Sequence, residues 1–126
     1  MKEEIKFLLK RAKSFFRDAK YDYENRDYDL AMFHIEQAIQ LLIKAKLLDL
    51  KGSYERTHSI RRLLSELSDL IESNRIREFI RENKKILRDL ERAYISSRYY
   101  YEEFFPDEVE NAMKIYRELR DILWRE

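Results

Sequence analysis

The segment AMFHIEQAIQLLIKAKLLDL, residues Ala31–Leu50, decides the fold because it is apolar on two sides of a helix. At about 100° per residue, its apolar side chains fall into one stripe and an opposite group. The stripe consists of Ala31, Ile35, Ala38, Leu42 and Ala45, and the opposite group consists of Phe33, Ile43 and Leu47. A helix that is apolar on two sides is covered on two sides. Its second cover is either another helix of the same bundle or a partner chain.

Helical spacing continues on both sides of this segment. Apolar residues recur at steps of three and four in four further stretches, which are residues 2–24, 60–70, 76–98 and 106–124. The connections are short, which favours antiparallel neighbours. We therefore predict an all-α fold, an up-and-down antiparallel bundle of four long helices plus one short helix, as a single domain over residues 1–126.

The helix ends carry typical residues. The single glycine, Gly52, follows the second helix, where a residue that tolerates positive φ is favoured. The single proline, Pro106, suits the first position of the last helix, where an N–H would lack a partner. Asp27 is expected to cap the second helix, and Thr57 or His58 the short one.

The composition excludes several classes of site. One glycine, one proline and no cysteine occur in 126 residues, where ordinary usage gives about nine glycines and six prolines. Glycine-rich phosphate loops are therefore excluded, and so are disulfides, thiolate metal sites and a cysteine nucleophile. No serine has the glycine-flanked context of a nucleophile elbow. Since there are only two histidines, we expect no metal site and no cofactor.

The charges nearly cancel. Lys and Arg number 26 and Asp and Glu 25, a formal net charge of +1, so attraction for nucleic acid must be local. High charge without cysteine fits a thermophile protein, in which ion-pair networks replace thermolabile side chains. No uncharged run approaches the roughly 18 residues that cross a bilayer, and no cleavage signal is present near Met1. We expect a cytoplasmic protein without membrane contact.

The stretch 76–98 carries a row of positive charge. Steps of four, three, four and four place five cations on one helical face, and these are Arg77, Arg81, Lys84, Arg88 and Arg92. Such a face can hold a nucleic-acid backbone in a salt-dependent manner. The alternative is a solvated face balanced by ion pairs between residues four positions apart.

Arg98 lies at the border between this basic face and the apolar stripe, where a guanidinium can be half buried. Tyr99, Tyr100 and Tyr101 follow it. These tyrosines either stack on bases or pack the end of the bundle, and Tyr and Arg also suit a protein interface.

The two histidines have different expectations. His34 falls beside the buried stripe of the second helix, so we expect a hydrogen-bonded core or interface histidine. His58 lies in a polar link close to Arg56, Arg61 and Arg62. It has either a capping or solvated role or a role in contacting a ligand.

Several of these pieces together resemble the HEPN family, the higher eukaryote and prokaryote nucleotide-binding domain. The resemblance covers nearly the whole chain, from Ala31–Leu50 through Gly52 and THSIRRLLSEL, which begins at Thr57, to AYISSRYY at Ala93–Tyr100. Its most specific parts are Gln37-Ala38, Lys44-Ala45, His58, Ala93, Tyr94 and Ser97-Arg98-Tyr99.

The resemblance implies a helical bundle that dimerises and is often encoded beside a small nucleotidyltransferase, in a two-component system of the toxin–antitoxin type. Many members are ribonucleases that use an arginine followed, after four to six residues, by a histidine. The positions at those spacings after Arg98 are Glu103, Phe104 and Phe105, so the histidine that would move a proton is missing. The candidate ligand-binding residues are Arg98, Tyr99, Tyr100, His58, Arg61, Arg62, Lys44 and Gln37.

The resulting hypothesis is a non-catalytic, homodimeric HEPN domain that binds a nucleotide or RNA, a partner nucleotidyltransferase, or both. The first alternative is a divergent metal-independent ribonuclease, in which Arg98 stabilises charge and His58 or a tyrosine replaces the missing histidine. The second is a structural scaffold for a protein partner.

Overall fold

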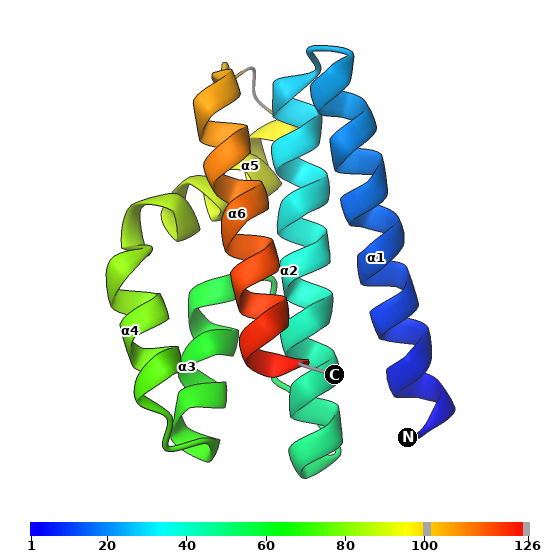
Figure 1. Ribbon diagram of the computed structural model, residues 1–126, viewed down its shortest axis with the longest axis vertical. Helices are drawn as coiled ribbons and strands as arrows, with labels where there is room; N and C mark the ends of the chain where they lie inside the picture. The colour runs from blue at the N-terminus through cyan, green and yellow to red at the C-terminus, as the bar shows by residue number, and fades with distance from the viewer. Residues whose placement is uncertain (100–101, 125–126) are drawn as a thin grey trace.

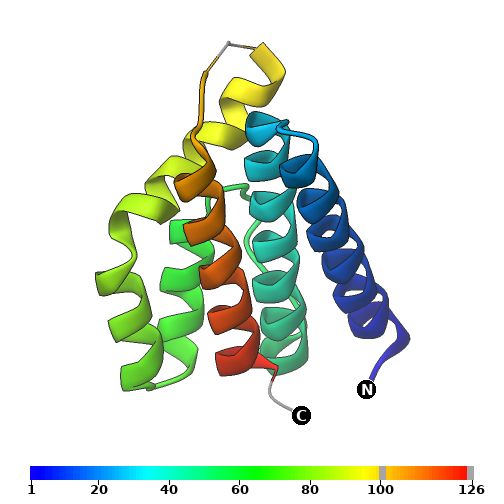
Figure 2. The same ribbon diagram turned by 45° about the horizontal axis from the view of Figure 1, so that its top comes forward.

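The computed structural model describes residues 1–99 and 102–124, with side chains for all of these except 97–99. Six helices occur in these ranges: α1 (Glu3–Glu24), α2 (Tyr28–Lys51), α3 (Ile60–Leu70), α4 (Asn74–Glu82), α5 (Lys84–Tyr99) and α6 (Pro106–Leu123). The described residues contain no strand, so the predicted all-α class is confirmed. Figure 1 shows α1, α2 and α6 side by side, with the shorter α3 and α4 beside them, and Figure 2 shows α5 leaning across one end.

Helix α2 is covered on both sides by helices of this chain. α1 and α6 pack against it, and so do α3 and α5. Ala38 from the predicted stripe is fully buried, and Ile43 and Leu47 from the opposite group are fully buried as well. The second cover predicted from the sequence is therefore supplied by the same bundle.

The sequence predicted one continuous helix over residues 76–98. The structure instead has two helices there, which are separated by Asn83. This residue has φ −117° and ψ 22°, and its Nδ2 donates a hydrogen bond to the carbonyl oxygen of Phe79 at 2.8 Å. Asparagine side chains compete for backbone partners in this way. The apolar stripe continues across the break, since Phe79 and Leu87 are both buried, and the spacing therefore gave no sign of it.

The connection over residues 52–59 turns back along α2. Tyr54 faces Lys44, Ser59 reaches Glu91 of α5, and farther along α3 Glu66 pairs with Lys51 at the end of α2. α3 therefore runs in the same direction as α2, as Figures 1 and 2 show, whereas the sequence predicted antiparallel neighbours. Eight extended residues can span about 26 Å, which is enough to retrace much of a helix of this length.

Two of the predicted helix ends are confirmed. Gly52 adopts the left-handed conformation with φ 77° at the end of α2. Pro106 is the first residue of α6, and Glu108 in its first turn accepts a hydrogen bond from the backbone N–H of Phe105 at 2.9 Å.

Two predicted caps are wrong. Asp27 precedes α2, but its side chain makes no capping hydrogen bond. Helix α3 is capped by Ser59, whose hydroxyl accepts from the backbone N–H of Arg62 at 3.2 Å. The Thr57 hydroxyl instead accepts from the backbone N–H of Ser59 at 3.1 Å. The cap therefore lies one residue beyond His58, where the Ser59 hydroxyl also donates to Glu91 of α5.

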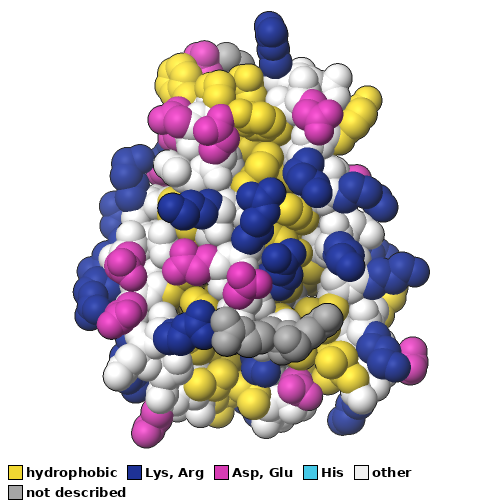
Figure 3. All heavy atoms as spheres, viewed as in Figure 1, with side chains coloured by type: hydrophobic (Ala, Val, Ile, Leu, Met, Phe, Trp, Pro, Cys, Tyr) yellow, Lys and Arg dark blue, Asp and Glu magenta, His cyan; other side chains and the backbone are white. Residues whose placement is uncertain are grey.

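Charged side chains of both signs cover the face seen in Figure 3. Among the described helices, none has the length and apolar character needed to cross a membrane.

Candidate functional site

A groove lies where the connection 52–59 folds back on α2. Its volume is about 540 Å³, and its lining consists of Lys44, Leu48, Gly52, Ser53, Tyr54, Arg56, Thr57 and His58. Three of these side chains are basic, Tyr54 adds an aromatic ring, and none is a carboxylate. We call it the Lys44 groove. It brings together two of the predicted site residues, Lys44 and His58.

Lys44 is half buried in this groove. Its Nζ lies 5.4 Å from the centre of the Tyr54 ring, in a cation–π contact. Burial lowers the pKa of Lys44, and the charge of the Glu36 carboxylate opposes that effect. No carboxylate among the described residues forms an ion pair with it at 4 Å or less. A partly dehydrated ammonium of this kind gains from a bound anion.

The fully buried Glu36 lies on α2, on the N-terminal side of Lys44, and was not singled out from the sequence. Gln37 donates to its Oε1 at 2.8 Å, and Gln40 donates to its Oε2. Burial raises the pKa of Glu36 to about 7, although both hydrogen bonds and the charge of Lys44 act in the opposite direction. Gln37 therefore serves an internal network. The available signal was the position of Glu36 on a helix that is covered on two sides, where some polar residues are buried too.

His58 stacks on a neighbouring aromatic side chain. Its ring centre lies 4.8 Å from that of Tyr94, and the Tyr94 ring in turn stacks on Phe33 at 6.2 Å. The connection 52–59, α5 and α2 meet in this row of rings. Arg98 follows Tyr94 by four residues, but the side chains of Arg98 and Tyr99, and the whole of Tyr100, lie outside the described residues.

Arg61 and Arg62 do not line the Lys44 groove. The Nε of Arg61 donates to Glu91 Oε1 at 2.7 Å, and the Ser59 hydroxyl donates to the other oxygen of the same carboxylate at 3.1 Å. Arg62 forms an ion pair with Glu55. These two arginines fix the start of α3 to α5 and to the connection, which the spacing of the sequence could not reveal.

The five cations of the predicted basic row are divided between two helices. Arg77 and Arg81 lie on α4, and the remaining three lie on α5, beyond the break at Asn83. Arg77 donates to the Asn74 side chain at 3.1 Å. Within the described residues, Arg81, Lys84 and Arg88 are exposed and have no ion pair.

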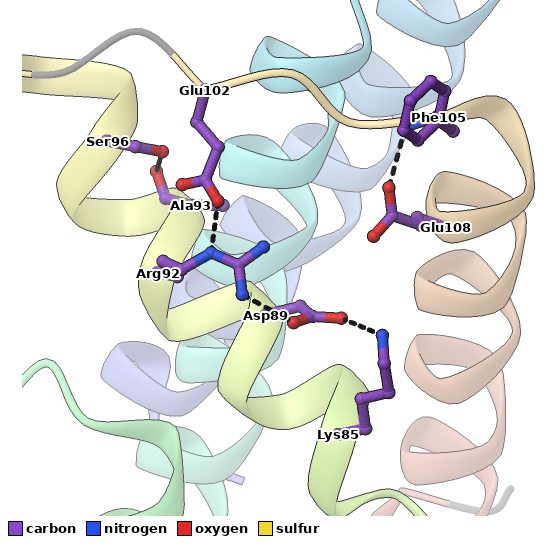
Figure 4. A network of polar contacts seen from close by, with 8 residues as sticks. All are labelled: Lys85, Asp89, Arg92, Ala93, Ser96, Glu102, Phe105 and Glu108. Carbon is purple, nitrogen blue, oxygen red and sulfur yellow. Dashed lines mark hydrogen bonds and ion pairs between the residues drawn. The ribbon is translucent and has the colours of Figure 1, made fainter.

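Arg92 is the paired member of this row. It donates to Asp89 Oδ1 at 2.9 Å and forms an ion pair with Glu102, while Lys85 contacts the other oxygen of Asp89 at 3.1 Å (Figure 4). The carboxylates compensate much of its charge, as expected of a balanced, solvated face.

His34 forms the internal contact expected of it. Its Nδ1 lies 2.5 Å from Oδ2 of Asp22, which ties α2 to α1. Burial raises the pKa of Asp22, and the hydrogen bond with His34 opposes that effect.

Comparison with known protein families decides the identity of the domain. The family model described as HEPN domain matches residues 5–126. This range contains the whole Lys44 groove and every helix except the first residues of α1. The chain belongs to the HEPN family. Membership supports a nucleotide- or RNA-related role in general. No curated protein and no solved structure matches this HEPN chain.

Proposed function

We propose that this HEPN domain binds a phosphate-bearing ligand, a nucleotide or an RNA, in the Lys44 groove without cleaving it. The observation that carries the proposal is the lining: Lys44, Arg56 and His58 contribute basic groups, and no carboxylate competes with an incoming phosphate. A charge-assisted hydrogen bond from a partly dehydrated ammonium to a phosphate is among the stronger polar contacts.

The rings of the groove suit the rest of a nucleotide. Tyr54 is half buried beside Lys44, and His58 is held by its stack on Tyr94. Aromatic faces accept bases by stacking without selecting one base strongly. A phosphate at Lys44 with a base against one of these rings is therefore the arrangement that we propose.

The proposal does not include catalysis, because two groups that could move the proton of a 2′-hydroxyl are missing or out of reach. Arg98 is not followed by a histidine at the spacing of the family's ribonucleases. The carboxyl of Glu36 has a pKa of about 7, close to that of an effective base, but the residue is 0% exposed and bound by Gln37 and Gln40. It does not reach a ligand.

A divergent ribonuclease is the second candidate, and one observation favours it. His58 lines the same groove as Lys44, so a bound RNA would contact an imidazole. In that candidate, His58 takes the place of the missing histidine and Arg98 stabilises the developing charge.

We further propose that the domain acts as a homodimer with a small nucleotidyltransferase partner, in a toxin–antitoxin-like pair. Family resemblance supports this part. A further support is the apolar surface at one end of the bundle, where Ile95 near the end of α5 and Phe105 at the start of α6 are each 56% exposed. Light scattering with size-exclusion chromatography tests the dimer, and a monomer at tens of micromolar contradicts it.

Titration calorimetry with nucleoside triphosphates and short RNAs tests the binding site. Lys44→Gln is expected to weaken binding at least about tenfold, since a charged hydrogen bond contributes roughly 1.5–3 kcal/mol. The matched control is Lys46→Gln, because Lys46 lies on the same helix and its Nζ lies over a ring as well, 4.7 Å from the centre of Trp124. Equal losses in both variants, or no binding by the natural chain, overturn the proposal.

A further inference from the structure

A second groove lies between α1 and α6, and its rim is positively charged. Its cations are Lys10, Lys13, Arg17 and Lys20 from α1, and Arg117 and Arg120 from α6. No carboxylate is among the lining residues. Figure 3 shows Lys and Arg side chains gathered over these two helices on either side of a hydrophobic strip. We call this feature the α1–α6 groove.

The floor of the groove consists of two stacked rings. The centres of the Phe16 and Tyr116 rings lie 4.1 Å apart with an interplanar angle of 13°. Both residues are buried, with 6% and 2% of their surfaces exposed. α1 and α6 each pack on α2, and these rings join them, so the long side chains of both helices stand along the edges.

Three of the cations are held over these rings. Lys20 Nζ and Arg117 Cζ lie 5.4 and 5.1 Å from the centre of Phe16, and Arg120 Cζ lies 6.0 Å from that of Tyr116. Cation–π contacts orient a charge without neutralising it. The positive groups are therefore positioned along the groove and still able to bind an anion.

The charge of the groove is largely uncompensated. Among the described residues, its ion pairs are those of Arg17 with Asp18 at 3.5 Å and of Arg120 with Asp121 at 3.7 Å, each between exposed sequence neighbours. Exposed pairs of this kind contribute little. Lys10, Lys13, Lys20 and Arg117 have no ion pair in that part of the chain.

We propose that the α1–α6 groove binds a single strand of nucleic acid through its phosphodiester backbone, at a site distinct from the Lys44 groove. The α1 cations, at steps of three, four and three, extend over about 15 Å of helix. That row is long enough to face several successive phosphates of one strand. Cations stand on both edges of the groove, so a single strand lying along it is contacted from both sides, whereas a duplex would rest on the outer ends of the same side chains.

The buried floor argues against the other occupants. Protein partners anchor apolar or aromatic side chains in a pocket, and Phe16 and Tyr116 are too deeply buried to form an aromatic pocket for such an anchor. A second copy of this chain in a closed twofold contact would place the six cations against themselves, and like charges across an interface oppose binding. The same floor leaves no ring face for bases, so binding is expected to be independent of sequence.

Fluorescence anisotropy with labelled 12-nucleotide oligo(U) and oligo(dT) tests the proposal. The double variant Lys13→Gln/Arg17→Gln removes two exposed charges that lie over neither floor ring. We expect affinity for both oligonucleotides to fall about tenfold or more, and the slope of log affinity against log salt to decrease by about 1.4, since each phosphate contact on a single strand contributes about 0.7. The natural chain should bind both sugars equally.

The matched control is Lys2→Gln/Lys6→Gln, which removes the same charge from the N-terminal part of the chain outside the groove. It is expected to change affinity less than twofold, and thermal unfolding confirms that both variants are folded. Equal losses in the two double variants, or no salt-dependent binding by the natural chain, overturn the proposal. Binding of a poly-glutamate peptide as tightly as the oligonucleotides, with the same dependence on Lys13 and Arg17, assigns the groove to an acidic protein segment and overturns it as well.

The two grooves are tested separately. Lys44→Gln should leave oligonucleotide binding at the α1–α6 groove within twofold, and Lys13→Gln/Arg17→Gln should leave mononucleotide binding at the Lys44 groove within twofold. Failure of the Lys44 groove to bind a nucleotide therefore does not remove the strand site.

Discussion

The ring of His58 stacks on Tyr94 with their centres 4.8 Å apart, although the two residues belong to segments far apart in the chain. This contact exists because the connection 52–59 turns back along α2 after Gly52. The same path places Tyr54 beside Lys44. One irregular segment thus builds most of the Lys44 groove, while the helices behind it supply the ammonium and the stacking partner.

Replacement of His58 by alanine is expected to weaken nucleotide binding about five- to tenfold, because it removes a ring and a hydrogen-bond donor from the groove. His58 is exposed but stacks on Tyr94, so the free energy of unfolding should fall by about 0.5–1.5 kcal/mol. Calorimetric titration and urea unfolding of the same preparations check the two parts. Unchanged affinity in a folded variant contradicts a ligand-contacting role and leaves His58 as a solvated residue.

Glu36 is expected to make the stability of the domain fall as pH rises. Burial raises its pKa from 4.5 to about 7 in the folded state, so between these values the folded chain holds a proton that the unfolded chain releases. The stabilising contribution is full below pH 4.5 and is lost as pH rises through 7. The shift corresponds to roughly 3 kcal/mol at most.

Glu36→Gln tests this expectation, because an amide stays neutral at every pH and the side chains of Gln37 and Gln40 can turn to match it. Relative to the natural chain, the variant should gain about 2–3 kcal/mol in urea unfolding between pH 5 and pH 8. The exposed Glu118→Gln serves as the control. A constant difference between Glu36→Gln and the natural chain at both pH values shows that Glu36 is already ionised at pH 5.

Ser59 is expected to stabilise the start of α3 through two contacts. Its hydroxyl accepts from the backbone N–H of Arg62 and donates to Glu91, so Ser59→Ala should lower the free energy of unfolding by about 1–2 kcal/mol. Ser65→Ala in the exposed middle of α3 is the matched control, with an expected change within about 0.5 kcal/mol. Chemical denaturation measures both, and equal effects would show that the cap contributes nothing.

The helices could be predicted from spacing because helical periodicity is local. The buried positions of α2 follow from the sequence for the same reason, and Gly52 and Pro106 mark helix ends through properties of their own backbones. The break at Asn83 could not be predicted, because the stripe on both sides stays in phase and the decisive hydrogen bond, to the carbonyl of Phe79, is one that asparagine forms only in some contexts.

The candidate sites were less predictable because they depend on contacts between distant segments. Lys44 and His58 were named from the sequence, yet their shared groove depends on the path of the connection 52–59. Arg61 was expected to face a ligand, and only the position of α5 shows that Glu91 binds it. The four α1 cations are readable as a row, but Arg117 joins them only when α6 packs beside α1.

Purified protein is expected to bind RNA without cleaving it. The single variants Arg98→Ala and His58→Ala, compared with the natural chain, test this. Cleavage at a 2′-hydroxyl needs a group that removes its proton, and the one described carboxyl with a pKa near 7, Glu36, is fully buried. Labelled RNA should therefore remain intact over hours with the natural chain and with both variants. Cleavage that is equal in all three preparations would come from a contaminating nuclease. Cleavage by the natural chain that disappears in both variants would establish the divergent ribonuclease, with Arg98 stabilising charge and His58 moving the proton. Binding of the same RNA, measured in parallel, separates an inactive domain from one that has lost its ligand.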